Sequence, residues 1–273
     1  MQKTDWGIGI IAGIVLGILA VTSGLAQRVI SAHASDTTLP IRELMLRSHT
    51  TWHSATGTAV TTWYAEGHTE TWHTTFQIVQ PNSGRVLWTT GADGKAFQWY
   101  GSKDGFYLVD SQEKIYTHLP VRNPTAFEME MKTLPGTLDE MEPDTVYRHP
   151  FGAQIPSVLG DYLYPVGLVT QASEEYTSLG KDTLLGRTVY ILEHQRTDGT
   201  GHLTAKSTYW VDSRTGIILK AVYYGGTHMQ TIIEKTDITA LDLDGATDTA
   251  VLRYTPAPGF EAVSPEVYFA QQH

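Results

Sequence analysis

The chain has 273 residues and a mass of 30.2 kDa, and its 29 acidic residues against 19 basic residues give a formal net charge of −10. This acidic balance argues against a nucleic-acid partner, because contacts to phosphates depend on Lys and Arg. The absence of cysteine excludes disulfides, thiol nucleophiles, zinc–thiolate sites and a lipidated N-terminal cysteine. Apolar residues at 41% and charged residues at 18% are typical of a folded globular chain of one or two domains.

Residues 1–34 form a separate segment with the character of a signal sequence. No charged residue occurs in residues 6–27, and about 20 helical residues span about 30 Å, the thickness of the hydrocarbon core of a bilayer. Two interpretations compete: an uncleaved signal anchor that crosses the membrane, and a signal peptide cleaved after the Ala-His-Ala sequence that ends at Ala34. The apolar run is long and Ala34 lies well beyond its end, so we favour the anchor.

Residues 35–273 contain no internal repeat or linker and are expected to form a single extracytoplasmic domain. A short helix is predicted near its start from the spacing of Ile41, Leu44, Met45 and Ser48. Sequence rich in Thr, Val, Trp and Tyr then favours strands. We expect these strands at residues 52–64, 72–79 and 85–90, followed by two short strands that end near residue 109.

Residues 123–165 have a helical pattern that prolines interrupt. Asn123 and Pro124 suit the start of one helix. A second helix is predicted from the apolar stripe of Ile155, Val158, Leu159, Tyr162 and Leu163. Strand-like sequence then returns at residues 174–179, 188–194, 203–211, 217–224 and 229–241, with a hairpin turn at residues 212–216. The Pro-rich residues 255–259 are expected to end regular structure.

The polar residues contain no recognisable catalytic arrangement. His49 and His53 are four residues apart, and His68 and His73 are five apart, but the surrounding sequence reads as strand or turn and lacks the Glu of the H-E-x-x-H zinc motif. The aspartates in residues 242–248 lack the ligand spacing of an EF-hand. Phosphate-binding, dinucleotide-binding and serine-nucleophile motifs are also absent. We therefore expect no enzymatic activity, no cofactor and no metal, and a metal-dependent hydrolase that uses the histidines is the weakest alternative.

Aromatic residues concentrate in the strands of the first half of the chain. They suit either an ordinary core beneath the central helices or the wall of a cavity for acyl chains, and composition alone favours the core. The residues in this stretch are Trp63, Trp72, Phe76, Trp88, Phe97, Trp99, Phe106 and Tyr107.

Five segments occur in an order that is typical of one protein superfamily. The clearest is residues 209–220, YWVDSRTGIILK, which fits a W-V-D-x-x-T-G-x-x-x-K hairpin. The others are residues 80–88, 102–110, 185–192 and 254–260. Together they resemble the bacterial outer-membrane lipoprotein carrier (LolA-like) superfamily. Its relatives include lipid-binding lipoproteins of mycobacterial type and a sensor domain that regulates an envelope-stress anti-sigma factor.

The resemblance implies an α+β fold: a strongly curved antiparallel sheet, an unclosed β-barrel, with short helices over its open side. Acyl chains would occupy the gap between sheet and helices. Arg85 matches a strand arginine of the relatives and is a candidate polar residue of this cavity. The candidate wall residues are Trp72, Phe76, Trp88, Trp99, Tyr107, Leu159 and Leu163.

Two functions follow as hypotheses from this resemblance. In the first, a membrane-tethered extracytoplasmic domain binds lipid acyl chains or a lipidated protein in an apolar cavity. In the second, the same fold senses the state of the envelope and contacts a membrane protein such as an anti-sigma factor. In both, residues 6–27 hold the protein at the cell membrane, and the domain is secreted instead if the signal is cleaved.

Overall fold

The computed structural model describes residues 38–65, 67–91, 94–121, 130, 133–142, 145, 147–156, 158–170 and 174–271. Most of them belong to strands. The strands are β1 Ser54–Ala65, β2 His68–Val79, β3 Ser83–Thr90, β4 Ala96–Ser102, β5 Gly105–Asp110, β6 Ile115–Pro120, β7 Glu174–Leu184, β8 Arg187–Thr197, β9 Leu203–Asp212, β10 Ile218–Gly225, β11 Thr231–Leu243 and β12 Glu261–Ala262.

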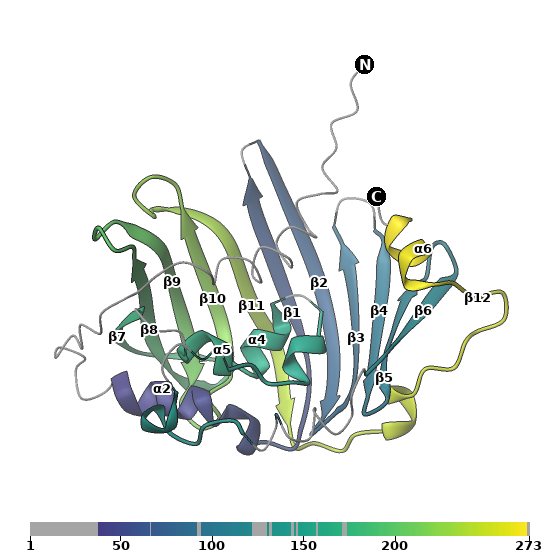
Figure 1. The fold of residues 1–273 in the computed structure, drawn as a ribbon, viewed down its shortest axis with the longest axis horizontal. Helices are drawn as coiled ribbons and strands as arrows, with labels where there is room; N and C mark the ends of the chain where they lie inside the picture. The colour runs from purple at the N-terminus through teal and green to yellow at the C-terminus, as the bar shows by residue number, and fades with distance from the viewer. Residues whose placement is uncertain are drawn as a thin grey trace.

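All twelve strands belong to one curved, open sheet (Figure 1). Their order is β12-β6-β5-β4-β3-β2-β1-β11-β10-β9-β8-β7. The sheet thus consists of two meanders, joined where β1 pairs with β11. Every neighbouring pair is antiparallel except β12 and β6, which are parallel. The edge strands β7 and β12 do not pair with each other, which confirms the predicted unclosed, mainly antiparallel sheet.

The described helices are short. They are α2 Thr38–Leu46, α4 Leu159–Leu163, α5 Val166–Val169 and α6 Pro265–Ala270, with 3-10 turns η1 Ser48–Thr50, η2 Leu138–Glu140, η3 Gly152–Gln154 and η4 Thr249–Leu252. Helices α2, α4 and α5 lie together over one end of one face of the sheet, and the strands extend beyond them (Figure 1). We call the face that these helices cover the inner face.

Strand β2 shows why one face of the sheet is buried. Phe76 and Ile78 are fully buried, whereas the alternate residues His73 and Thr75 are exposed, as expected when successive side chains of a strand point to opposite faces. Beneath the helices the inner face forms two apolar clusters. One joins β1–β4 to α4, and the other joins α2, α4 and α5 to β8–β10.

The predicted elements agree with the structure best where the hydrophobic period is regular. The N-terminal helix and the strands are present, although the helix from Ile155 to Leu163 is reduced to the five residues of α4 because prolines at 156 and 165 flank it. The helix predicted at Asn123 lies outside the described residues. The expectation that regular structure ends at residues 255–259 was wrong, since β12 and α6 follow and Tyr268 is buried.

The predicted membrane segment, residues 6–27, also lies outside the described residues. In the described part of the chain, no helix has both the length and the apolar character needed to cross a bilayer.

Candidate functional site

The register of the sheet assigns most of the predicted cavity residues to the inner face. Phe76 pairs with Val86, which pairs with Trp99, and Trp88 lies between Thr74 and Phe97. Directly opposed residues in a sheet share a face, so all of these side chains point toward the helices. From α4, Leu159 and Leu163 meet them in the same apolar cluster.

The predicted cavity residues on the inner face differ in how far they are buried. Phe76, Trp99, Leu159 and Leu163 are each at most 2% exposed and pack against one another. They form a filled core in this structure. Trp72, like Trp88, lies on the same face but remains half-buried.

Two predicted residues lie on the opposite, outer face. Tyr107 is paired with Tyr100 and His118, and its ring lies 5.1 Å from that of Tyr254 in the C-terminal segment. The Nη2 of Arg85 donates a hydrogen bond of 3.0 Å to Oε1 of Gln98, and its guanidinium lies 5.4 Å from the centre of the Tyr100 ring. Tyr107 and Arg85 therefore face away from the inner side of the sheet.

Half-buried aromatic side chains form two pairs on neighbouring strands of the inner face. Trp63 and Trp72 meet edge to face with ring centres 4.7 Å apart, and Trp88 stacks on Phe97 at 5.6 Å. All four are partly accessible. We call Trp63, Trp72, Trp88 and Phe97 the aromatic band; it crosses β1 to β4.

Two carboxylates hydrogen-bond to the indole rings at one end of the aromatic band. Trp63 Nε1 donates to Oε2 of Glu234 at 3.2 Å, and Trp72 Nε1 donates to Oε1 of Glu70 at 2.5 Å. Burial raises the pKa of Glu234 to about 7, an effect that the charge of Asp161 reinforces and hydrogen bonding partly offsets. This carboxyl group is therefore about half protonated at neutral pH.

A hollow of about 360 Å³ lies on the inner side of the second meander, beside α5. Ligand sites in proteins commonly have volumes of about 300 to 1,000 Å³, so this space suits part of an amphiphilic molecule. Its lining includes Leu168, His194, Ser207, Tyr209, Tyr223 and Ile233.

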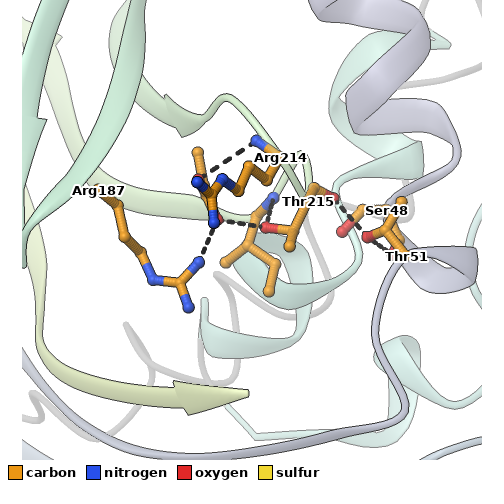
Figure 2. Close-up of polar contacts among 7 residues, drawn as sticks. Ser48, Thr51, Arg187, Arg214 and Thr215 are labelled. Carbon is orange, nitrogen blue, oxygen red and sulfur yellow. Dashed lines mark hydrogen bonds and ion pairs between the residues drawn. The ribbon is translucent and has the colours of Figure 1, made fainter. Parts of the chain in front are cut away.

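The hairpin that carries the clearest sequence motif has a structural role around Asp212. This fully buried carboxylate accepts from Nη1 of Arg187 at 2.8 Å and from Oγ1 of Thr215 at 2.7 Å (Figure 2). The carbonyl of Thr215 in turn accepts from Oγ1 of Thr51 at 2.9 Å. The motif therefore ties the β9–β10 hairpin to β8 and to the segment that follows α2.

The residues considered for a metal are not assembled into a site. Among the residues that the structure describes, no group of three His, Asp, Glu or Cys side chains could hold a metal ion. His68 and His73 are exposed on β2. Asp244 instead accepts hydrogen bonds from the backbone of His53 and Ser54 at 2.6 and 3.0 Å, which fastens the end of β11 to the start of β1.

Sequence reasoning did not identify Glu70 and Glu234 as site residues. Their roles depend on the pairing of β1 with both β2 and β11, which brings each of them opposite Trp63. The local sequence held one usable signal, because Glu70 is a charged residue two positions from Trp72 and would share its strand face.

Comparisons with protein families and with curated proteins find no match. Solved structures with a similar shape include an uncharacterized conserved protein from Thermus thermophilus, at 10% identity and a TM-score of 0.48, covering 82% of this chain and 98% of that one. The MucA/MucB complex of Pseudomonas aeruginosa is similar at 13% identity and a TM-score of 0.44, and the match covers 79% of this chain and 61% of that one. Lipoprotein LppX of Mycobacterium tuberculosis is similar at 9% identity and a TM-score of 0.40, and the match covers 77% of this chain and 97% of that one.

Proposed function

We propose that the protein binds acyl chains, of a lipid or of a lipidated protein, along the inner face of its sheet. The observation that carries this proposal is the aromatic band, because four large apolar side chains are left partly accessible on the face that elsewhere forms the core. Accessible apolar side chains grouped on one face are typical of interaction sites.

The energy of such binding requires no catalytic group or cofactor. Each buried methylene contributes about 0.8 kcal/mol, so ten of them contribute about 8 kcal/mol, which corresponds to a dissociation constant of about 1 µM before ordering costs are subtracted. The core around Phe76 and Trp99 is filled. The chain would therefore lie over the aromatic band and toward the hollow beside α5, past the end of α4.

We further propose that residues 6–27 tether this domain at the outer surface of the cell membrane. A tethered domain suits the local handling of lipids or lipoproteins beside the bilayer. Fractionation tests this point: the full chain is expected in the membrane fraction after alkaline carbonate extraction, and recovery in the soluble fraction would contradict an uncleaved anchor.

Photocrosslinking with a fatty acid that carries a diazirine in its alkyl chain tests acyl binding. With the full-length protein in nanodiscs, adducts are expected on inner-face residues of β1–β4. The double change Trp72→Ala and Trp88→Ala should reduce these adducts strongly, whereas Tyr107→Ala on the outer face should not. Adducts confined to residues 6–27, or equal labelling of both variants, would refute the proposal.

A second candidate function is recognition of a membrane protein such as an anti-sigma factor. One observation favours it: among the described strands, β7 pairs only with β8, and its other edge is open over 11 residues. Open edges accept an added strand from a partner. A photoreactive residue placed at Leu179, which is 53% exposed on β7, should crosslink to a specific membrane protein in cells. The absence of such a crosslink would count against this function.

A further inference from the structure

One row of side chains crosses four strands at the inner-face end of the aromatic band. Tyr223 of β10 lies opposite Glu234 of β11, which lies opposite Trp63 of β1, which lies opposite Glu70 of β2. Directly opposed residues on neighbouring strands are about 5 Å apart. The two carboxylates therefore flank one indole ring, and the ring of Trp72 in the next row packs against it, with ring centres 4.7 Å apart.

Helix α4 adds a buried hydroxyl and a third acidic side chain to this row. Tyr162 is fully buried, and its hydroxyl, which faces Glu234, Thr236 and Tyr223, forms no hydrogen bond of good geometry with any described residue. Oε1 of Glu234 likewise lacks a partner in the described part of the chain. Buried polar atoms are rarely left unpaired, so this hydroxyl and this carboxylate oxygen, which face each other, are the polar atoms of the row that a ligand donor could pair with.

Asp161 of α4 lies close enough to the same row for its charge to act on Glu234. Its side chain is exposed to solvent, yet desolvation raises its pKa, which the charge of Arg148 partly offsets. Solvent exposure and a raised pKa occur together in a carboxylate that water reaches but that protein surrounds on most sides. Its charge acts on Glu234 and on Tyr223, which places it on the inner side.

In the described part of the chain, little positive charge lies close to this group. Within the described ranges, no Lys or Arg forms an ion pair with Glu70, Glu234 or Asp161. The positive charge of Arg148 lowers the pKa of Asp161, but Arg148 is itself exposed to solvent. Aromatic ring faces and carboxylates together attract cations.

We propose that Glu234, Glu70, Asp161, Tyr162 and Trp63 form a subsite for the ammonium head group of an amphiphile whose alkyl chain lies along the aromatic band. This inference rests on the proposed acyl-chain function and adds the charge of the head group to it. An anionic head group would be repelled by the carboxylates, and a neutral one would leave their charge uncompensated.

Binding of an ammonium group at the subsite is coupled to loss of a proton from Glu234. The carboxylic O–H bond breaks, the proton passes to the buffer, and the carboxylate pairs with the ligand cation. With its pKa at about 7, Glu234 would release about 0.9 proton per ligand at pH 6 and about 0.1 at pH 8. The groups that face it are Asp161 and Tyr162 of α4 and Tyr223 of β10, and none of these is cationic.

Three probes with the same chain and different head groups test the subsite: decyltrimethylammonium, decanoate and decyl maltoside, each below its micelle concentration. Titration calorimetry uses the full-length protein in nanodiscs, with empty nanodiscs as the blank. We expect the ammonium probe to bind at least about tenfold more tightly than decyl maltoside, which a difference of about 1.4 kcal/mol would produce. At pH 6 its binding enthalpy should vary with the ionisation enthalpy of the buffer.

Variants separate the subsite from chain binding. Glu234→Gln removes the charge and is expected to abolish most of the preference for ammonium and the proton release. Glu70→Gln provides a second test should the first variant misfold. Asp237→Asn is the matched control, because Asp237 lies on the outer face of the same strand and pairs with Lys235 at 2.6 Å.

The outcomes distinguish the two proposals. Equal affinity for the ammonium and maltoside probes, or tighter binding of decanoate, would overturn the ammonium subsite while leaving acyl-chain binding in place. Failure of all three probes to bind would overturn both. Retention of the preference in both Glu234→Gln and Glu70→Gln would also refute the assignment of these residues.

Discussion

Replacing His149 with asparagine should remove much of the acid sensitivity of the fold. His149 is 2% exposed, and its ring stacks on Tyr164 at 4.0 Å. Its Nδ1 accepts a hydrogen bond of 3.1 Å from the backbone N–H of Gly152, so the neutral ring carries its proton on Nε2. Burial, with a smaller contribution from the charge of nearby His49, lowers the pKa of His149 to about 3.

The size of the effect follows from the difference between folded and unfolded protonation. The folded ring stays neutral down to about pH 3, whereas the unfolded ring takes up a proton below its ordinary pKa of about 6.5. Falling pH therefore favours the unfolded state, and the stability present above about pH 6.5 is lost progressively toward pH 3. Between pH 7.5 and pH 5 the free energy of unfolding should fall by about 2 kcal/mol on account of this residue.

Urea denaturation at pH 7.5, 6 and 5 measures this contribution. In His149→Asn, the side-chain oxygen can still accept from Gly152, and the pH-dependent loss should shrink by about 2 kcal/mol. His73→Asn on the exposed face of β2 is the control, and it should lose as much stability between pH 7.5 and pH 5 as the parent protein. If His149→Asn loses as much stability between pH 7.5 and pH 5 as the parent, the buried neutral histidine is not the cause.

Two further predictions concern the hairpin after β9. Asp212→Asn removes the ion pair with Arg187. Because Arg187 is about one-quarter exposed, the free energy of unfolding should fall by about 2 kcal/mol, which is less than for a fully buried pair. Urea denaturation that is unchanged in this variant would contradict the structural role of Asp212. Gly216→Ala should cost about 1 to 3 kcal/mol, since Gly216 has φ +74° and an added Cβ would lie 2.3 Å from the carbonyl oxygen of Leu44. Gly199→Ala meets nothing within 4 Å and should change the melting temperature little, so equal losses in the two glycine variants would show that the contact with α2 is unimportant.

Sequence periodicity predicted the strands well because the inner face is buried and the outer face of β2 is not. Phe76 and Ile78 alternate with exposed residues, which gives a period of two. The faces of β5 could not be assigned in this way. Its sequence FYLV is apolar throughout, since Leu108 packs against the inner core while Tyr107 is covered by Tyr254 from the C-terminal segment.

Short sequence patterns could not predict the carboxylates beside Trp63, for a different reason. Glu234 meets Trp63 through the β1–β11 pair, whose partners are 171 residues apart in the chain. Neither the register of such a pair nor the position of α4 over it is encoded in any short segment. A charged residue on a strand reads as solvent-exposed until the opposing strand and the covering helix are known.

The boundary of the helical cover explains why similar aromatic residues have different roles on one face. Phe76 and Trp72 are four residues apart on the same side of β2. Of the two, only Phe76 belongs to the filled core that includes Leu159 and Leu163 of α4. Its burial stabilises the fold and leaves no surface for a ligand. Trp72 keeps accessible area and a hydrogen-bonded carboxylate beside it. A short helical cover on long strands therefore lets one continuous sheet face serve as core at one end and as binding surface at the other.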